Sequence, residues 1–261
     1  MKRTLVLLTL LTVPGAMTPV GVQADIVSAR SALSGGDPAE AVKLATDGDI
    51  AAQLALGEAY LTGRGVPRNA ERAAIWFRKA AEAGDLSAQI MLAQVHDQGT
   101  GADTDAAEAA RWLEKAALRG DAASQLDLGG RYLEGRGVTA DPHRAMMWIV
   151  KAAAQGGPEA QMRLGAAIAN GIAGAADPAE GLKWIRRAAD QGYVEALMTM
   201  ATIYAQGVLG ERDIVAAYKW FSLAANMGDD RAMQITNAMK ERMLPEQLSR
   251  AEKMVREWTP K

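Results

Sequence analysis

Small and apolar residues recur at helical spacing from residue 50 onward, and they predict a helix over residues 50–62. Ala52, Leu56 and Tyr60 follow one another at intervals of four, so they lie on one face of that helix. Position 57 is glycine, which leaves room for a neighbouring helix to approach closely. We therefore expect this first helix, called the A helix, to pack through a face of small residues.

A second apolar face follows a glycine-rich loop and predicts a second helix, called the B helix. Asn69 precedes this helix, and its side chain can accept a hydrogen bond from a backbone N–H group of the first turn. Ala73, Trp76 and Ala80 then share one face. Gly84 follows as a left-handed cap that ends the helix. The two helices and their loop form one unit.

The same unit recurs with a period of 36 residues over residues 49–229 and without a gap. Several independent columns agree on this period, which is the sequence signature of stacked repeats. We therefore expect five helix pairs that stack into an all-α solenoid. The columns are the tryptophans Trp76, Trp112, Trp148, Trp184 and Trp220, the glycines Gly84, Gly120, Gly156, Gly192 and Gly228, and the caps Asn69, Asp105, Asp141, Asp177 and Asp213.

The segment 1–24 has the order of a secretory signal peptide. Lys2 and Arg3 give a basic start, an apolar run follows over residues 5–13, and small residues end at Ala24. A transmembrane anchor is the alternative, but it needs about 20 apolar residues, roughly twice the length of this run. We expect cleavage after Ala24, a periplasmic or secreted protein, and no stable membrane insertion after cleavage.

Both ends of the repeat array read as caps, which a solenoid needs to shield its terminal apolar surfaces from water. Residues 25–48 predict N-terminal capping helices, one over about 25–33 and one from Pro38 to about residue 47. Residues 230–261 predict C-terminal capping helices, one over about 231–243 and one that begins at Pro245. In the last segment the inward-facing residues are expected to be Leu248, Ala251, Val255 and Trp258.

The composition argues against most kinds of catalytic chemistry. The chain has no cysteine, two histidines and a formal net charge of −2, and its basic residues form no cluster. We therefore expect no thiolate catalysis, no cofactor, no metal site, no nucleic-acid binding and no enzymatic activity. His96 lies in the tyrosine position of an A helix and His143 in the first turn of a B helix, where both are expected to be structural. The tryptophan column could stack on carbohydrate, but its spacing favours packing.

These columns resemble the Sel1-like repeat, a relative of the tetratricopeptide repeat, over about residues 49–229. The resemblance implies a right-handed α/α solenoid superhelix and an adaptor or regulator, for instance of a sensor-kinase or envelope-assembly complex. Four positions depart from the pattern: His96 and Ile168 replace tyrosine, Ala173 replaces a loop glycine, and Leu223 replaces lysine. In the third repeat the matching residues are Leu128-Gly129, Tyr132, Gly135-Arg136-Gly137-Val138, Asp141, Trp148, Lys151-Ala152-Ala153 and Gly156.

The positions that vary from repeat to repeat lie on one stripe of the A helices, because they are spaced by three, four and seven residues. In solenoids of this type the A helices line the concave surface, which offers an extended groove to a partner. We expect a peptide or loop of a partner protein to bind there, and the oligomeric state stays open. The candidate partner-binding residues are Glu58, Met91, Gln94, Asp127, Arg131, Glu134, Arg163, Asn170, Thr202 and Gln206.

Three other interpretations remain open from the sequence. The variable stripe could be a solvated surface with no partner. The chain could instead be a scaffold for exopolysaccharide or envelope assembly, with glycan in the groove. A cell-wall hydrolase or a β-lactam-binding protein is disfavoured, because no nucleophile–base pair is evident and the β-lactam-linked relatives are rich in cysteine, which this chain lacks.

Overall fold

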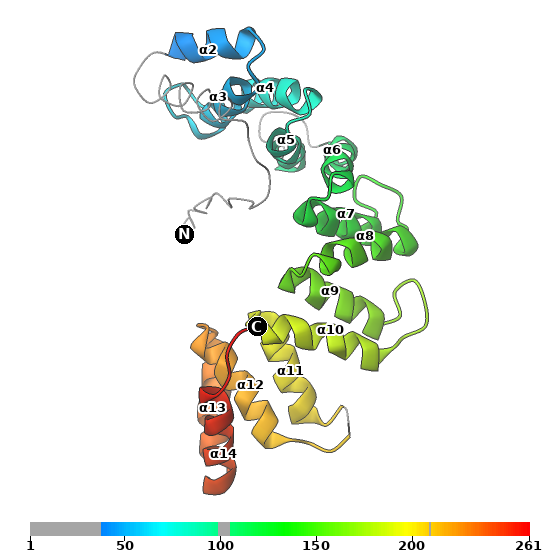
Figure 1. The fold of residues 1–261 in the computed structure, drawn as a ribbon, viewed down its shortest axis with the longest axis vertical. Coiled ribbons are helices and arrows are strands. Elements are labelled where there is room, and N and C mark those ends of the chain that lie inside the picture. Colours follow the sequence, from blue (N-terminus) through cyan, green and yellow to red (C-terminus); the bar gives the residue numbers. More distant parts are fainter. Residues whose placement is uncertain (1–37, 99–104, 209) are drawn as a thin grey trace. The chain divides into compact units, whose positions relative to one another are not determined.

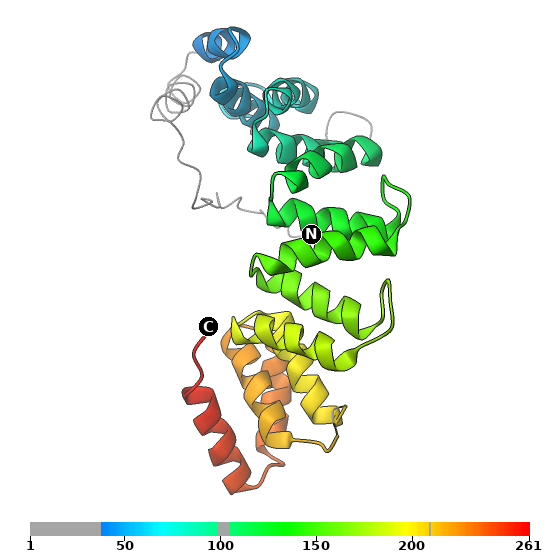
Figure 2. The same cartoon turned by 45° about the vertical axis from the view of Figure 1, so that its right-hand side comes forward.

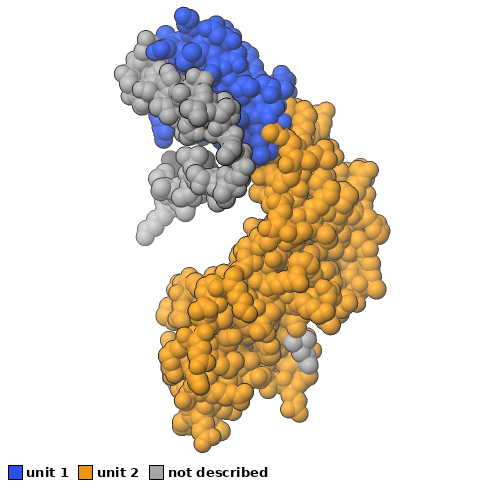
Figure 3. All heavy atoms as spheres, viewed as in Figure 1, with its two compact units in different colours: residues 1–95, 99–103 blue, residues 96–98, 104–261 orange. Residues whose placement is uncertain are grey.

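The computed structural model describes residues 38–98, 105–208 and 210–261, and it divides into two compact units. Unit 1 comprises residues 1–95 and 99–103, and unit 2 comprises residues 96–98 and 104–261 (Figure 3). The predicted signal peptide at 1–24 and the predicted cap helix at 25–33 lie outside the described residues.

Every regular element in the described residues is an α-helix (Figures 1 and 2). Within unit 2 the helices α7 to α10 stack one after another in both views. No helix among the described residues is long and apolar enough to cross a bilayer. The predicted all-α helix-pair fold is confirmed. The helices are α2 (Pro38–Thr46), α3 (Ile50–Thr62), α4 (Ala70–Glu82), α5 (Leu86–Gln98), α6 (Ala106–Leu118), α7 (Ala122–Glu134), α8 (Pro142–Ala154), α9 (Pro158–Ala169), α10 (Pro178–Asp190), α11 (Val194–Gln206), α12 (Ile214–Asn226), α13 (Asp230–Lys240) and α14 (Pro245–Arg256).

Side-chain caps begin the B helices at the predicted column. Each cap accepts a hydrogen bond from the backbone N–H three residues later, at 2.9–3.0 Å. These bonds satisfy one of the N–H groups that a helix start leaves without an intrahelical partner. The glycine that ends each B helix has φ between 84° and 95°, so the predicted left-handed cap is also present. The five B-helix caps are Asn69, Asp105, Asp141, Asp177 and Asp213.

The small residue of the A helix is the point of closest approach within a helix pair. A Cβ atom at Gly57 would lie 2.5 Å from the ring of Phe77, and one at Gly129 would lie 2.7 Å from Ile149. In the fourth repeat the backbones themselves meet, because a Cβ atom at Gly165 would lie 2.6 Å from the carbonyl oxygen of Gly181. Any side chain at these positions would separate the two helices.

The tryptophan column is less buried than the sequence suggested. Trp112, Trp148 and Trp220 are buried, whereas Trp76 and Trp184 are only half-buried. The residue that follows each tryptophan is buried in all five repeats and packs into the helix pair, a column that the sequence analysis did not single out. Its members are Phe77, Leu113, Ile149, Ile185 and Phe221.

A cation lies over the ring of each tryptophan in this column. In the first four repeats the charged atom of the residue three positions later lies 3.7–4.4 Å from the ring centroid. The fifth repeat has Leu223 at that position, and there Lys219 lies 4.2 Å from the ring of Trp220 instead. Each contact has the geometry of a cation–π interaction, both at the buried rings and at the half-buried rings of Trp76 and Trp184. The four cations are Lys79, Lys115, Lys151 and Arg187.

Buried glutamines tie the A helices of the first three repeats to the end of the preceding helix. The Nε2 atom of Gln125 donates to the carbonyl oxygen of Ala117 at 3.0 Å, and Gln53 and Gln89 make the equivalent bonds to Ala45 and Ala81 at 3.0 and 3.3 Å. A second glutamine extends the link, because Gln155 Nε2 donates both to Gln125 Oε1 and to the carbonyl oxygen of Gly120, each at 2.9 Å. Gln191 repeats this arrangement on Gln161 and Gly156.

The same link is incomplete in the first repeat, and this predicts a stabilising substitution. Ala83 is the counterpart of Gln155, and Gln53 Oε1 is buried without a hydrogen-bond partner among the described residues. Ala83→Gln should supply that partner and raise the free energy of unfolding by about 0.5–1.5 kcal/mol in urea titrations. In a Gln53→Met background most of the gain should vanish. An equal gain in both backgrounds would show that the glutamine pair is not its source.

Ala173 carries a left-handed backbone conformation that suits glycine, and this predicts a second stabilising substitution. It has φ 66°, whereas Gly137, its counterpart in the preceding repeat, has φ 74°. Ala173→Gly should raise the free energy of unfolding by up to about 1 kcal/mol, because the steric cost of a Cβ in this region exceeds the entropy cost of glycine. The reverse change, Gly137→Ala, should destabilise, since its Cβ would collide with the Ala106 backbone. A destabilised Ala173→Gly variant in urea titrations would contradict the assignment.

The C-terminal cap consists of α13 and α14, both of which pack on α12. The first of these ends at Lys240, three residues earlier than predicted, and the second begins at Pro245 as predicted. Ala251 is fully buried against Val215 and Tyr218, with Leu248 half-buried beside it. Val255 and Trp258 pack against the neighbouring cluster around Trp220, although Trp258 lies beyond the end of α14.

Candidate functional site

Two adjoining hollows lie over the A helices of the third and fourth repeats, in unit 2. Their volumes are about 320 and 380 Å³. Gly130, Glu159 and Arg163 border both, so the hollows form one surface, called here the A-helix groove. The first is lined by Ala123, Leu126, Asp127, Gly130, Arg131, Glu134, Arg136, Glu159 and Arg163. The second is lined by Gly130, Leu133, Ile149, Glu159, Arg163, Ala166, Ala167, Asn170, Ile172, Tyr193 and Glu195.

The groove contains half of the residues that the sequence analysis selected, namely Asp127, Arg131, Glu134, Arg163 and Asn170. The other half line neither hollow. Glu58 and Met91 are half-buried in unit 1, and Gln94, in the same unit, is exposed. Thr202 and Gln206 are exposed on α11. The structure thus brings together the candidates from the third and fourth repeats.

Arg131 was predicted to bind a partner at the surface, but the structure places its side chain in the interior. Its side chain is fully buried and forms an ion pair with Asp97, and its Nε atom lies 3.3 Å from Asp127 Oδ1. Its Nη1 atom is also 3.5 Å from the carbonyl oxygen of Ala106. A buried guanidinium requires such partners, because an unpaired charge in a protein interior is very costly. Arg131 therefore holds the floor of the groove and positions Asp127.

Arg136 joins the same network from the loop after α7, and sequence reasoning did not select it. Its Nη2 atom lies 3.4 Å from Asp97 Oδ2 and 3.6 Å from Asp127 Oδ1, and half of its side chain is exposed. Two arginines and two aspartates therefore balance one another at this end of the groove. The signal was present in the sequence as a basic residue in the loop, but only the fold shows which carboxylates it meets.

The wall formed by α9 and α11 carries a further ion pair and an aromatic hydroxyl. Arg163 Nη2 lies 3.0 Å from Glu159 Oε1, one helical turn away. The absence of a side chain at Gly130 leaves space opposite Arg163, whose Nη1 would lie 3.8 Å from a Cβ there. Burial raises the pKa of Tyr193, and the nearby charges of Glu195 and Glu159 raise it further. The hydroxyl therefore stays protonated and donates to Glu195 at 3.3 Å.

Neither histidine lines the A-helix groove. His96 is buried in α5 and His143 is exposed in the first turn of α8. In the part of the chain that the structure describes, no three His, Asp or Glu side chains are grouped so that they could hold a metal ion. The groove itself is lined by the ion-paired side chains of Asp127 and Glu159, by the carboxylates of Glu134 and Glu195, and by apolar residues.

The pattern of the Sel1 repeat matches residues 50–85, 86–121, 122–157, 158–193 and 194–229, so the chain belongs to the Sel1 repeat family. Sel1 repeat proteins generally mediate protein–protein interactions. No curated protein matches the sequence.

The solved structures that are similar to the chain include two with a Sel1-like repeat fold. A protective antigen of uropathogenic Escherichia coli with an SLR fold is 29% identical, with a TM-score of 0.74 over 90% of this chain. This chain spans 52% of that antigen's length. A Sel1 repeat protein from Oxalobacter formigenes is 26% identical, with a TM-score of 0.69, over 88% of this chain and 96% of that one. Both similarities support the solenoid of helix pairs.

The buried network under the groove predicts unequal costs for its two arginines. Arg131→Met should lower the free energy of unfolding by about 2–4 kcal/mol, because it leaves Asp97 and Asp127 beside a buried apolar side chain. Arg136→Met should cost less than about 1 kcal/mol, because that side chain is half exposed and water replaces it. Urea unfolding followed by circular dichroism measures both, and equal losses would contradict the structural role of Arg131.

Proposed function

We propose that this chain is an exported interaction module that binds an extended segment of a partner protein in the A-helix groove. The observation that carries the proposal is the position of the groove. It lies where the residues change from repeat to repeat, while the surrounding columns keep the fold. An adaptor or regulator of an envelope or sensor-kinase complex is the role that fits such a module best.

The charges of the groove favour a partner segment that carries basic side chains. Asp127 is balanced by the two arginines beneath it, and Glu159 is paired with Arg163. Glu134 and Glu195 add two further carboxylates to the lining. Neither is paired with a basic side chain among the described residues, so a lysine or arginine of the partner would find complementary charge there. Leu133 and Ile172 line the same hollow as Glu195 and offer apolar contact to the partner segment.

Site-specific photocrosslinking tests the groove directly. A photoreactive residue at Glu134 or Asn170 should form a covalent adduct with the same partner in living cells, because both positions line the groove. Matched probes at Arg111 and Lys183, which are exposed on the B helices α6 and α10, should not form that adduct. Adducts of equal yield from all four positions, or from none, would contradict binding in the groove.

Export is tested by sequencing the N-terminus of the protein isolated from cells. The signal pattern predicts that the mature chain begins at Asp25 and is recovered in the periplasmic fraction or the medium. A protein that keeps Met1 and stays with the cytoplasmic fraction would contradict export.

A further inference from the structure

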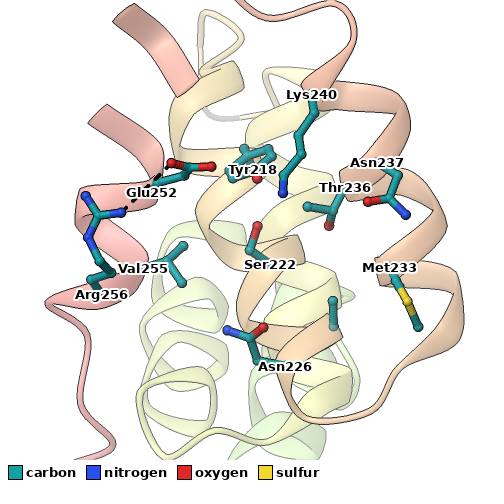
Figure 4. Close-up of a pocket in the computed structure, with 11 residues that line it drawn as sticks. Tyr218, Ser222, Asn226, Met233, Thr236, Asn237, Lys240, Glu252, Val255 and Arg256 are labelled. Atoms are coloured by element: carbon teal, nitrogen blue, oxygen red, sulfur yellow. Dashed lines mark ion pairs between the residues drawn. The ribbon is translucent and has the colours of Figure 1, made fainter. Parts of the chain in front are cut away.

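A separate hollow of about 300 Å³ lies between α12, α13 and α14, away from the A-helix groove (Figure 4). The helix α12 contributes Tyr218, Ser222 and Asn226, which are spaced by four and therefore share one face. The hollow lies between α12, the last helix of the fifth repeat, and the two cap helices, so most of the residues that line it lie outside the repeats.

Ser222 is the residue of this hollow that points most directly to a bound ligand. Its side chain is only 8% exposed and its hydroxyl oxygen has no hydrogen-bond partner among the described residues. A buried hydroxyl without a partner destabilises a protein, so its presence calls for an explanation. Figure 4 shows Ser222 among the labelled lining residues, between Tyr218 and Asn226 along α12 and facing the side of Thr236 on α13.

The charged groups around Ser222 favour an anion. Lys240 extends from α13 toward the interior of the hollow (Figure 4), and it forms no ion pair with a carboxylate in the described parts of the chain. The one acidic residue of the lining, Glu252, lies 3.9 Å from Arg256 and is balanced by it. The hollow therefore combines one unbalanced ammonium group with a buried hydroxyl, and both can donate to a carboxylate.

Apolar surface lies beside these donors. Met233 of α13 and Val255 of α14 line the hollow together with Ala225. A chain end that carries both a carboxylate and an apolar side chain would use both parts of the site. A free inorganic anion would use only the donors.

We propose that this hollow binds the C-terminal carboxylate of a peptide. The carboxylate accepts hydrogen bonds from Lys240 Nζ and the Ser222 hydroxyl, and the last apolar side chain packs against Met233 and Val255. The site is independent of the A-helix groove, and its occupant need not be the groove's partner.

Calorimetry with N-acetyl-Ala-Ala-Leu tests the proposal with the full chain. The free acid should bind, and the C-terminal amide should bind at least about tenfold more weakly, because it loses the charge-assisted hydrogen bonds. Acetate should bind much more weakly than the tripeptide. Equal affinity of acid and amide, no binding of either at millimolar concentration, or acetate binding as tightly as the tripeptide would each overturn the proposal.

Four variants assign the roles of the residues. Lys240→Met should weaken binding by about tenfold, whereas Lys240→Arg should retain most of it. Lys253→Met removes a lysine of α14 that does not line the hollow, and it should leave the affinity unchanged. Ser222→Ala should weaken binding yet leave the urea midpoint of unfolding unchanged or higher, because it removes a hydroxyl that has no partner in the fold. A lower midpoint for Ser222→Ala, or equal losses from Lys240→Met and Lys253→Met, would contradict the site.

Discussion

The structure depends on the close approach of the two helices within each pair. At Gly57, Gly129 and Gly165 the A helix leaves no room for even one additional carbon atom against the B helix. This constraint explains why small residues occupy one position of each A helix and why alanine dominates the inner faces of both helices. The larger residues Phe77, Ile149 and Ile185 of the B helices pack against these small positions of the A helices.

Polar groups connect one pair to the next. Gln53, Gln89 and Gln125 each donate a further hydrogen bond to a carbonyl oxygen at the end of the preceding helix, which also accepts from a backbone N–H of the turn. The side-chain caps accept hydrogen bonds from the N–H groups at the starts of the helices. These contacts are made by residues that recur every 36 positions. Most of the recurrent positions therefore serve to stabilise the fold. The residues that vary are left to shape the surface, and the A-helix groove lies among them.

The sequence predicted the helix pairs, their caps and their boundaries well, because each depends on short-range chemistry repeated five times. It missed contacts that need three-dimensional placement. The glutamine column was visible at 36-residue spacing, yet the pairing of Gln125 with Gln155 depends on the turn that brings them together. Arg131 was selected as a surface residue, although the loop residue Arg136 and the carboxylate of Asp97 complete a buried network around it. The hollow around Ser222 forms where α12 meets the two cap helices beyond the repeats, so the repeat period carries no information about most of its lining.

The central claim is that the recurrent columns hold the fold and the variable positions of the groove are free for recognition. The most direct test is the free energy of unfolding of the triple variant Glu134→Ala, Arg163→Ala, Asn170→Ala, measured in urea. The account predicts a change of less than about 1 kcal/mol, because these exposed side chains make only local ion pairs and hydrogen bonds. A loss of several kcal/mol would show that the groove residues hold the scaffold together, and it would contradict the account.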